Sequence, residues 1–199
     1  AALVAIALGL SAWASPAGGL YFSAGVDSIP IGVRDRLALI AAAAALSALG
    51  SVGVASAGIW WPNDLMVGDR KLGGILCESI ALGQAWAAVV GIGINAQTPL
   101  EALSPELRGR AASLADRGVN AERLLEVMLR ALEGTIEQVH REGLVPVLKL
   151  LSAHDTLRGQ SVTLEADGRH FAGVAAGIDD RGDLRLKVDG EMVTFPAAT

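Results

Sequence analysis

Two long apolar runs in the middle of the chain constrain its fold most. Residues 71–80 and 84–95 are both strand-like, and they follow one another with a junction at Leu82 and Gly83. Because both runs are largely apolar, each strand is expected to have one face covered by helices. The pattern therefore predicts an α+β domain, built on an antiparallel or mixed sheet with helices packed on it.

Further strands and a helix are predicted on the N-terminal side of these runs. Residues 20–26 are a predicted strand, and the alanine-rich residues 33–49 are a predicted helix that ends before Gly50. Residues 58–67 are a predicted strand that Pro62 interrupts, so we expect this strand to bend or to lie at a sheet margin.

Helix signals follow the apolar runs. Ser104 and Pro105 form a good helix start, because a capping hydroxyl precedes proline at the first helical position. Asn120 is a predicted cap for the next helix. That helix has apolar residues at spacings of three and four, which predicts one stripe facing the core: Leu125, Met128, Leu132, Ile136 and Val139.

The pattern changes near Asp155. From Gly159 onward the chain is predicted to form four short strands, divided by the turn pairs Asp167-Gly168, Arg181-Gly182 and Asp189-Gly190. We therefore predict two domains, at residues 1–153 and 154–199. The second is small enough that it is expected to pack on the first.

Composition narrows the function classes. The 199 residues are 52% hydrophobic but only 4% aromatic, which is typical of an aliphatic core. A net charge of −5 without a basic stripe disfavours nucleic-acid binding. The single cysteine, Cys77, excludes an internal disulfide framework and is expected to pack in the core rather than act as a nucleophile. The three histidines are scattered, so we expect no protein metal cage.

No apolar run reaches the roughly 18 to 20 residues that a membrane span needs, so no membrane partner is expected. The start, AALVAIALGLSAWASPAGG, has an apolar stretch like that of a targeting segment but lacks its positive region. We interpret it as a part of a longer protein, so that this chain begins inside a buried strand.

Polar residues cluster on the predicted hairpin around Gly68 and Asp69. Asn63, Asp64 and Lys71 lie in apolar strands on its two arms, so the turn brings them together. A hairpin with solvated charges is the simpler interpretation. Lys71 is, however, the sole lysine among the first 148 residues.

A cation at this position suits a reaction between two anions. Two negative groups about 4 Å apart repel by about 4 kcal/mol at an effective dielectric constant near 20. Trp60 and Trp61 add a stacking surface, and Gly73 and Gly74 remove side chains where a ligand or another backbone could approach.

A second glycine motif, VVGIGINAQ, ends the next strand. Gly91, Gly93 and Asn95 could hold a nucleobase or a phosphate, although the third glycine of the dinucleotide-binding fingerprint is missing. Glycines that relieve packing at a strand crossing are the alternative.

Together these segments resemble the biotin protein ligases, adenylating enzymes that attach biotin to a carrier lysine. The resemblance rests on WWPNDLMVGDRKLGGIL, on GIGIN and on WASPAGGLYFS, in the family's order and spacing. It extends to LRGQSV and AGIDDRGDLRL, which are similar to the family's small SH3-like β-barrel.

The resemblance implies that biotin and Mg-ATP react to form biotinyl-AMP, a mixed anhydride. A lysine of a biotin carboxyl carrier protein then attacks this anhydride. Lys71 would hold the carboxylate and α-phosphate oxygens, and Asp64 would serve Mg²⁺ or the incoming amine. A cytoplasmic location and a possible homodimer complete the expectation, since two chains could pair along bare strand edges at residues 71–80 and 84–95. The residues expected to bind substrates are Gly73 and Gly74 for biotin, Asn63 and Asn95 for the nucleotide, and Trp13 and Trp61 for stacking.

Three departures from the family pattern keep alternatives open. The arginine-rich loop expected before Trp13 is replaced by AIALGLSA, Trp60 stands where the family has lysine, and the Ser/Thr-Thr-Asn segment is absent from this chain. A non-catalytic homologue that binds or scaffolds is therefore the second hypothesis. The related lipoate and octanoyl transferases lack the Trp-Pro-Asn-Asp hairpin, and no helix-turn-helix for DNA precedes these segments.

Overall fold

The first part of the chain folds around a five-stranded antiparallel sheet. The computed structural model describes residues 17–26, 31–82, 85–166 and 168–197. The strand order is β1-β5-β4-β3-β2, and every neighbouring pair is antiparallel. The strands are β1 (Leu20–Val26), β2 (Ala57–Trp60), β3 (Asp64–Val67), β4 (Arg70–Leu82) and β5 (Ala85–Ile94).

The strand predicted over residues 58–67 is in fact a pair of strands. β2 and β3 run antiparallel, and Trp60 lies opposite Asp64 in the register. Pro62 lies in the turn between them, where the Trp61–Pro62 peptide bond is cis. Proline has no N–H for a ladder, so the chain reverses there instead of continuing as one bent strand. The hairpin at Gly68, whose φ is +62°, is confirmed.

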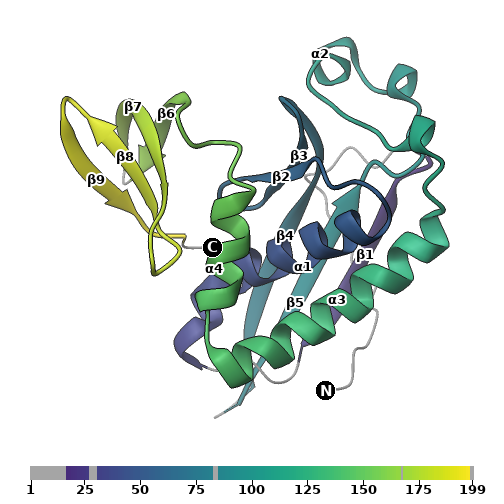
Figure 1. The fold of residues 1–199 in the computed structure, drawn as a ribbon, viewed down its shortest axis with the longest axis horizontal. Coiled ribbons are helices and arrows are strands. Elements are labelled where there is room, and N and C mark those ends of the chain that lie inside the picture. The colour runs from purple at the N-terminus through teal and green to yellow at the C-terminus, as the bar shows by residue number, and fades with distance from the viewer. Residues whose placement is uncertain (1–16, 27–30, 83–84, 167, 198–199) are drawn as a thin grey trace.

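Three helices lie together on one face of the sheet, as Figure 1 shows. They are α1 (Leu37–Ser51), α3 (Ala121–Glu142) and α4 (Val145–Ala153). A 3-10 turn at Ile31–Arg36 precedes α1. Most of α1 is buried, because it lies between the sheet and the other two helices. Its alanines leave room for backbones to approach on all sides.

Three details of the helices differ from the predictions. The helix predicted over residues 33–49 begins at Leu37, because the residues before it belong to the 3-10 turn. Gly50 lies inside α1, and Gly53, with φ at +87°, provides the left-handed residue after the helix. The buried stripe of α3 begins at Leu124, which is fully buried, instead of Leu125. Asn120 caps α3 as predicted, since its Oδ1 accepts the Arg123 N–H at 2.8 Å.

Only short helices occupy the loop between the sheet and α3. Ser104 and Pro105 do start a helix, but α2 (Pro105–Arg108) has a single turn, between the 3-10 turns Leu100–Ala102 and Ala115–Arg117. No helix of the described residues is long and apolar enough to cross a membrane.

The C-terminal strands form a second antiparallel sheet in the order β6-β7-β8-β9. The four predicted strands are confirmed as β6 (Ser161–Ala166), β7 (Arg169–Ile178), β8 (Leu184–Val188) and β9 (Glu191–Phe195). Phe171 and Phe195 pack edge to face, with ring centroids 5.0 Å apart. This sheet lies beside α4 (Figure 1) and agrees with a small SH3-like domain. The boundary between residues 153 and 154 stays a prediction.

Candidate functional site

The two faces of the first sheet have different roles. Ile75 lies opposite Ile92 and Cys77 opposite Val90, and all four side chains are buried in the core under the helices. Side chains alternate along a strand, and directly opposed residues share a face. The other face, here named the glycine face, therefore carries these residues: Trp60, Asp64, Lys71, Gly74, Gly91 and Gly93.

Lys71 and Asp64 meet on the glycine face, as the hairpin predicted. The Nζ of Lys71 lies 2.5 Å from Oδ1 of Asp64, and their side chains are 45% and 32% exposed. A register shift between Leu65 and Met66 places Lys71 opposite Met66, and Leu72 is the extra residue. An ion pair this exposed contributes little to stability, so it serves to place two charges at the surface of the sheet.

Gly73 and Gly74 are glycines for different reasons. A Cβ on Gly73 would overlap the carbonyl oxygen of Gly93 and lie 2.8 Å from Cδ1 of Ile94. The neighbouring backbone, one of the two alternatives left open by the sequence, therefore requires glycine there. Gly74 lies opposite Gly93 on the glycine face, next to Gly91, so three glycines form a shallow floor beside Lys71. Contact of this floor with biotin stays a prediction.

Tyr21 borders the same floor from β1. It lies opposite Gly93 in the register and so belongs to the glycine face. Burial raises the pKa of the Tyr21 phenol, and Thr98 partly opposes that rise. The phenol is consequently a neutral hydrogen-bond donor at physiological pH.

Asn63 fastens the turn between β2 and β3 to β4. Its side-chain Nδ2 donates to the carbonyl oxygen of Ile75 at 2.9 Å, and the Ile75 N–H donates back to the Asn63 carbonyl at 2.9 Å. The side-chain amide is thus engaged with the main chain next to Asp64. The predicted nucleotide contact of Asn63 stays a prediction.

Asn95 fastens a loop beside Lys71. Its Nδ2 donates to the Ala112 carbonyl at 3.0 Å, and its own carbonyl accepts the Leu114 N–H at 2.9 Å. The Lys71 N–H donates to the Arg110 carbonyl at 2.8 Å, and the Lys71 carbonyl accepts the Ala112 N–H at 2.8 Å. Residues 110–114 therefore form a wall of the site next to Lys71. Sequence reasoning missed this segment, which carries no periodic or turn signal.

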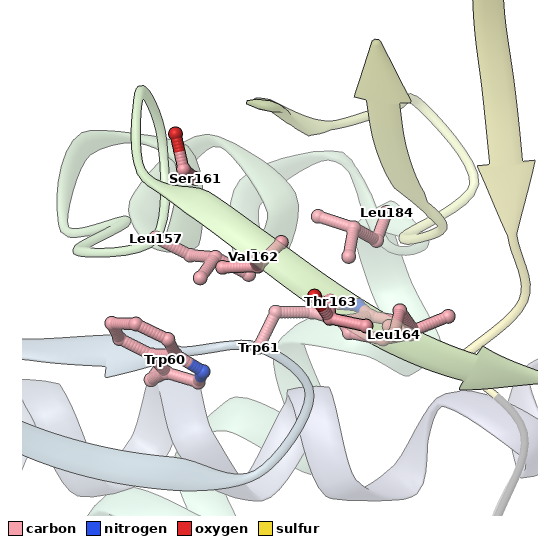
Figure 2. Close-up of a pocket in the computed structure, with 8 residues that line it drawn as sticks. All are labelled: Trp60, Trp61, Leu157, Ser161, Val162, Thr163, Leu164 and Leu184. Carbon is pink, nitrogen blue, oxygen red and sulfur yellow. The ribbon is translucent and has the colours of Figure 1, made fainter. Parts of the chain in front are cut away.

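The two tryptophans lie between the two sheets. Figure 2 shows them pointing away from each other in a pocket under β6, with Leu157, Val162, Leu164 and Leu184 among its lining residues. Trp60 is 36% exposed, whereas Trp61 is 8% exposed and its Nε1 donates to the Gly182 carbonyl at 3.0 Å. The stacking role of Trp61 stays a prediction, and Trp13 lies outside the described residues.

Cys77 is unsuited to nucleophilic chemistry. Its side chain is buried, and burial raises the pKa of its thiol to about 12. The thiolate is the reactive form, so almost none is present at neutral pH. We expect Ellman's reagent to leave Cys77 unmodified at pH 8 in the native protein and to titrate one thiol after unfolding in guanidinium. Rapid reaction of the folded protein would contradict the buried placement.

Metal ligands are sparse in the described part of the chain. There, no group of three or more histidine, cysteine, aspartate or glutamate side chains is placed to hold a metal ion. Asp64 is the carboxylate beside Lys71. The arrangement can accordingly bind anions and orient an amine, and Asp64 could hold a divalent cation together with a substrate's phosphates.

Comparisons with known proteins agree with this geometry. Residues 9–95 match the profile of the Biotin/lipoate A/B protein ligase family, and residues 158–199 match that of the biotin protein ligase C-terminal domain. The biotin–[acetyl-CoA-carboxylase] ligase of Paracoccus denitrificans is 30% identical over 196 residues, which cover 94% of this chain and 81% of that protein. The bifunctional ligase/repressor BirA of Escherichia coli is 32% identical over 157 residues, which cover 77% of this chain.

The chain spans about half the length of some relatives, since the match covers 49% of the Escherichia coli protein. Among solved structures, biotin protein ligase from Aquifex aeolicus in complex with biotin and ATP aligns with a TM-score of 0.79 at 22% identity, covering 92% of this chain and 78% of that chain. That likeness shows a common fold. The match along the Paracoccus denitrificans ligase and the two profiles together show that this chain belongs to the biotin protein ligase family.

Proposed function

We propose that this protein is a biotin–protein ligase that activates biotin with ATP and transfers it to a lysine of a biotin carboxyl carrier protein. Membership of the family supports this function. The observation that carries it is the Lys71–Asp64 pair beside a floor of glycines. A cation beside glycine main chain, which carries no side chains, suits a reaction in which a carboxylate approaches a phosphate.

In the first step, a carboxylate oxygen of biotin attacks the α-phosphorus of ATP. The bond from that phosphorus to the oxygen bridging to the β-phosphate breaks, pyrophosphate leaves, and biotinyl-AMP forms without any proton transfer. Lys71 lowers the repulsion between the two anions. An ammonium has three N–H donors, so the group that contacts Asp64 can also donate to substrate oxygens.

In the second step, the neutral amine of the carrier lysine attacks the acyl carbon. The bond from that carbon to the phosphate oxygen breaks, AMP leaves, and the amine releases one proton to the solvent. Asp64 lies on the glycine face and can accept a hydrogen bond from the incoming amine. Its main contribution is orientation, which lowers the entropic barrier of the transfer.

Mg²⁺ would arrive with ATP. This cation keeps several waters and binds through one or two carboxylates plus substrate phosphates. Asp64 could supply such a carboxylate, and the described residues build no larger metal cage. When bound, Mg²⁺ neutralises phosphate charge.

We also propose that two copies pair along β4. Beyond Ile75, β4 continues past the end of β3 and has β5 as its strand partner among the described residues. Among the described residues this part of β4 is an edge. β5 lies between β4 and β1, so the bare edge predicted for residues 84–95 is wrong for the part that β1 covers. An exposed edge favours pairing with a second chain.

The unpaired thiol and the use of ATP support a cytoplasmic location.

Exchange of labelled pyrophosphate into ATP tests the function. Activation of biotin is reversible, so we expect exchange that requires biotin. Absence of exchange above the level of Lys71→Ala would overturn the proposal. Thermal stabilisation by biotin without any exchange would instead favour a non-catalytic binding protein.

A further inference from the structure

The turn between β7 and β8 clamps the second sheet to the first domain. The Nε1 of Trp61 donates to the Gly182 carbonyl at 3.0 Å. The Arg36 guanidinium donates through Nη2 to Oδ1 of Asp183 at 2.6 Å and through Nε to the Arg181 carbonyl at 2.6 Å. These five residues, Arg36, Trp61, Arg181, Gly182 and Asp183, are called the clamp below.

The clamp is tightly built. Asp183 is 2% exposed, and its Oδ1 also accepts the Ala197 N–H at 3.3 Å. Gly182 has φ at +90°, and a Cβ there would lie 2.6 Å from Cδ1 of Leu39. A buried carboxylate needs its cationic partner, because an uncompensated buried charge is strongly unfavourable. The contact therefore fixes where the turn lies against the 3-10 turn and α1.

One clamp residue, Trp61, lies three positions before Asp64, the candidate catalytic carboxylate. Trp61 and Pro62 form the turn that leads to Asn63, whose amide is fastened to the Ile75 carbonyl. Asp64 follows directly and pairs with Lys71. The turn is thus held at Trp61 by the second sheet and at Asn63 by β4, and Figure 2 shows the Trp61 side chain reaching under β6 from this turn.

We propose that Trp61 is a positioning residue through which the C-terminal sheet holds Asp64 in place. This inference rests on the proposed function. The indole N–H bond to Gly182 restricts the turn, and the Arg36–Asp183 pair keeps Gly182 where that bond can form. Without the clamp, the turn gains freedom, and the Asp64 carboxylate is less often oriented towards Lys71 and the reacting amine or phosphate. Misplacement of a catalytic group lowers the rate even when substrates still bind.

A double-mutant cycle separates positioning from packing. Trp61→Phe keeps a buried ring but removes the N–H donor. We expect it to lower kcat for transfer of biotin to a lysine of the carrier protein by about tenfold, with KM for ATP little changed. In an Asp64→Ala background, Trp61→Phe should have little further effect, because the group it positions is gone. An equal loss in both backgrounds would overturn the proposal.

Hydrogen exchange tests the clamp without activity. Asp183→Asn is nearly isosteric and weakens the Arg36 contact. We expect faster amide exchange in residues 61–66 than in the wild type, with α3 unchanged. Glu126→Gln, which removes a carboxylate paired with Arg123 and Arg130 on the exposed face of α3, is the matched control and should leave residues 61–66 unchanged.

The outcomes distinguish the two proposals. One outcome is that Asp183→Asn loosens residues 61–66 selectively while the wild-type protein shows no pyrophosphate exchange. That result would refute the ligase activity but support the clamp. If amide hydrogen exchange at residues 61–66 is unchanged in Asp183→Asn, the clamp is overturned whatever the enzymatic activity. If Trp61→Phe does not fold, Asp183→Asn and Arg36→Lys take its place in the cycle, and Arg36→Lys should retain more activity than Arg36→Ala.

Discussion

Replacement of Lys71 by alanine is expected to lower the rate of biotin-dependent pyrophosphate exchange by about a hundredfold to a thousandfold. Removing one donor aimed at developing charge typically costs this much in an active site. Lys71 lies beside the glycine floor, so its ammonium is placed to offset the repulsion between carboxylate and phosphate. Initial rates at saturating ATP and biotin give the measurement.

The two other lysines provide matched controls. Lys149 on α4 and Lys187 on β8 are also exposed, and their alanine variants should exchange pyrophosphate at the wild-type rate. Lys71→Ala should also keep its fold, because the Lys71–Asp64 pair is solvent-exposed and such pairs contribute about 0–1 kcal/mol. Equal losses in all three variants would argue against a specific role for Lys71.

Local rules predicted most elements of the fold. β1 has the predicted bounds, Asn120 caps α3, and the four predicted C-terminal strands form. The errors share a cause. Gly50 and Gly53 are equally good helix terminators in the sequence, and Leu124 and Leu125 are neighbours that could each begin an apolar stripe. Packing of α1 and α3 against each other decides such cases, and packing is not local information.

The candidate site was predictable where it depends on one hairpin. Asp64 and Lys71 meet because the turn at Gly68 folds their strands together. The contacts of Asn95 with residues 110–114 and of Trp61 with Gly182 were not predictable. Both join a side chain to a distant main-chain carbonyl. Every residue has such a carbonyl, so the sequence does not indicate which one accepts the hydrogen bond. The same limit applies to Gly73, whose need for glycine comes from the backbone of β5.

Gly73→Ala is expected to destabilise the protein by about 3 kcal/mol, since overpacking of a well-packed interior typically costs 1–3 kcal/mol and sometimes more. The added methyl would overlap the Gly93 carbonyl oxygen, which is main chain of the neighbouring strand and cannot rotate away. β4 and β5 would have to separate near the floor that Gly74 and Gly93 form. Urea unfolding monitored by far-ultraviolet circular dichroism gives the free energy of unfolding.

Gly134→Ala is the matched control for that experiment. Gly134 lies within α3, and nothing is within 4 Å of the position its Cβ would take. Alanine is the better helix former, so this variant should gain about 0.5–1 kcal/mol. Opposite signs for the same added methyl would show that close strand packing, not the conformational freedom of glycine, dictates Gly73. A Gly73→Ala protein as stable as the wild type would mean that β4 and β5 are farther apart at this point, and the glycine floor beside Lys71 would then lose its structural basis.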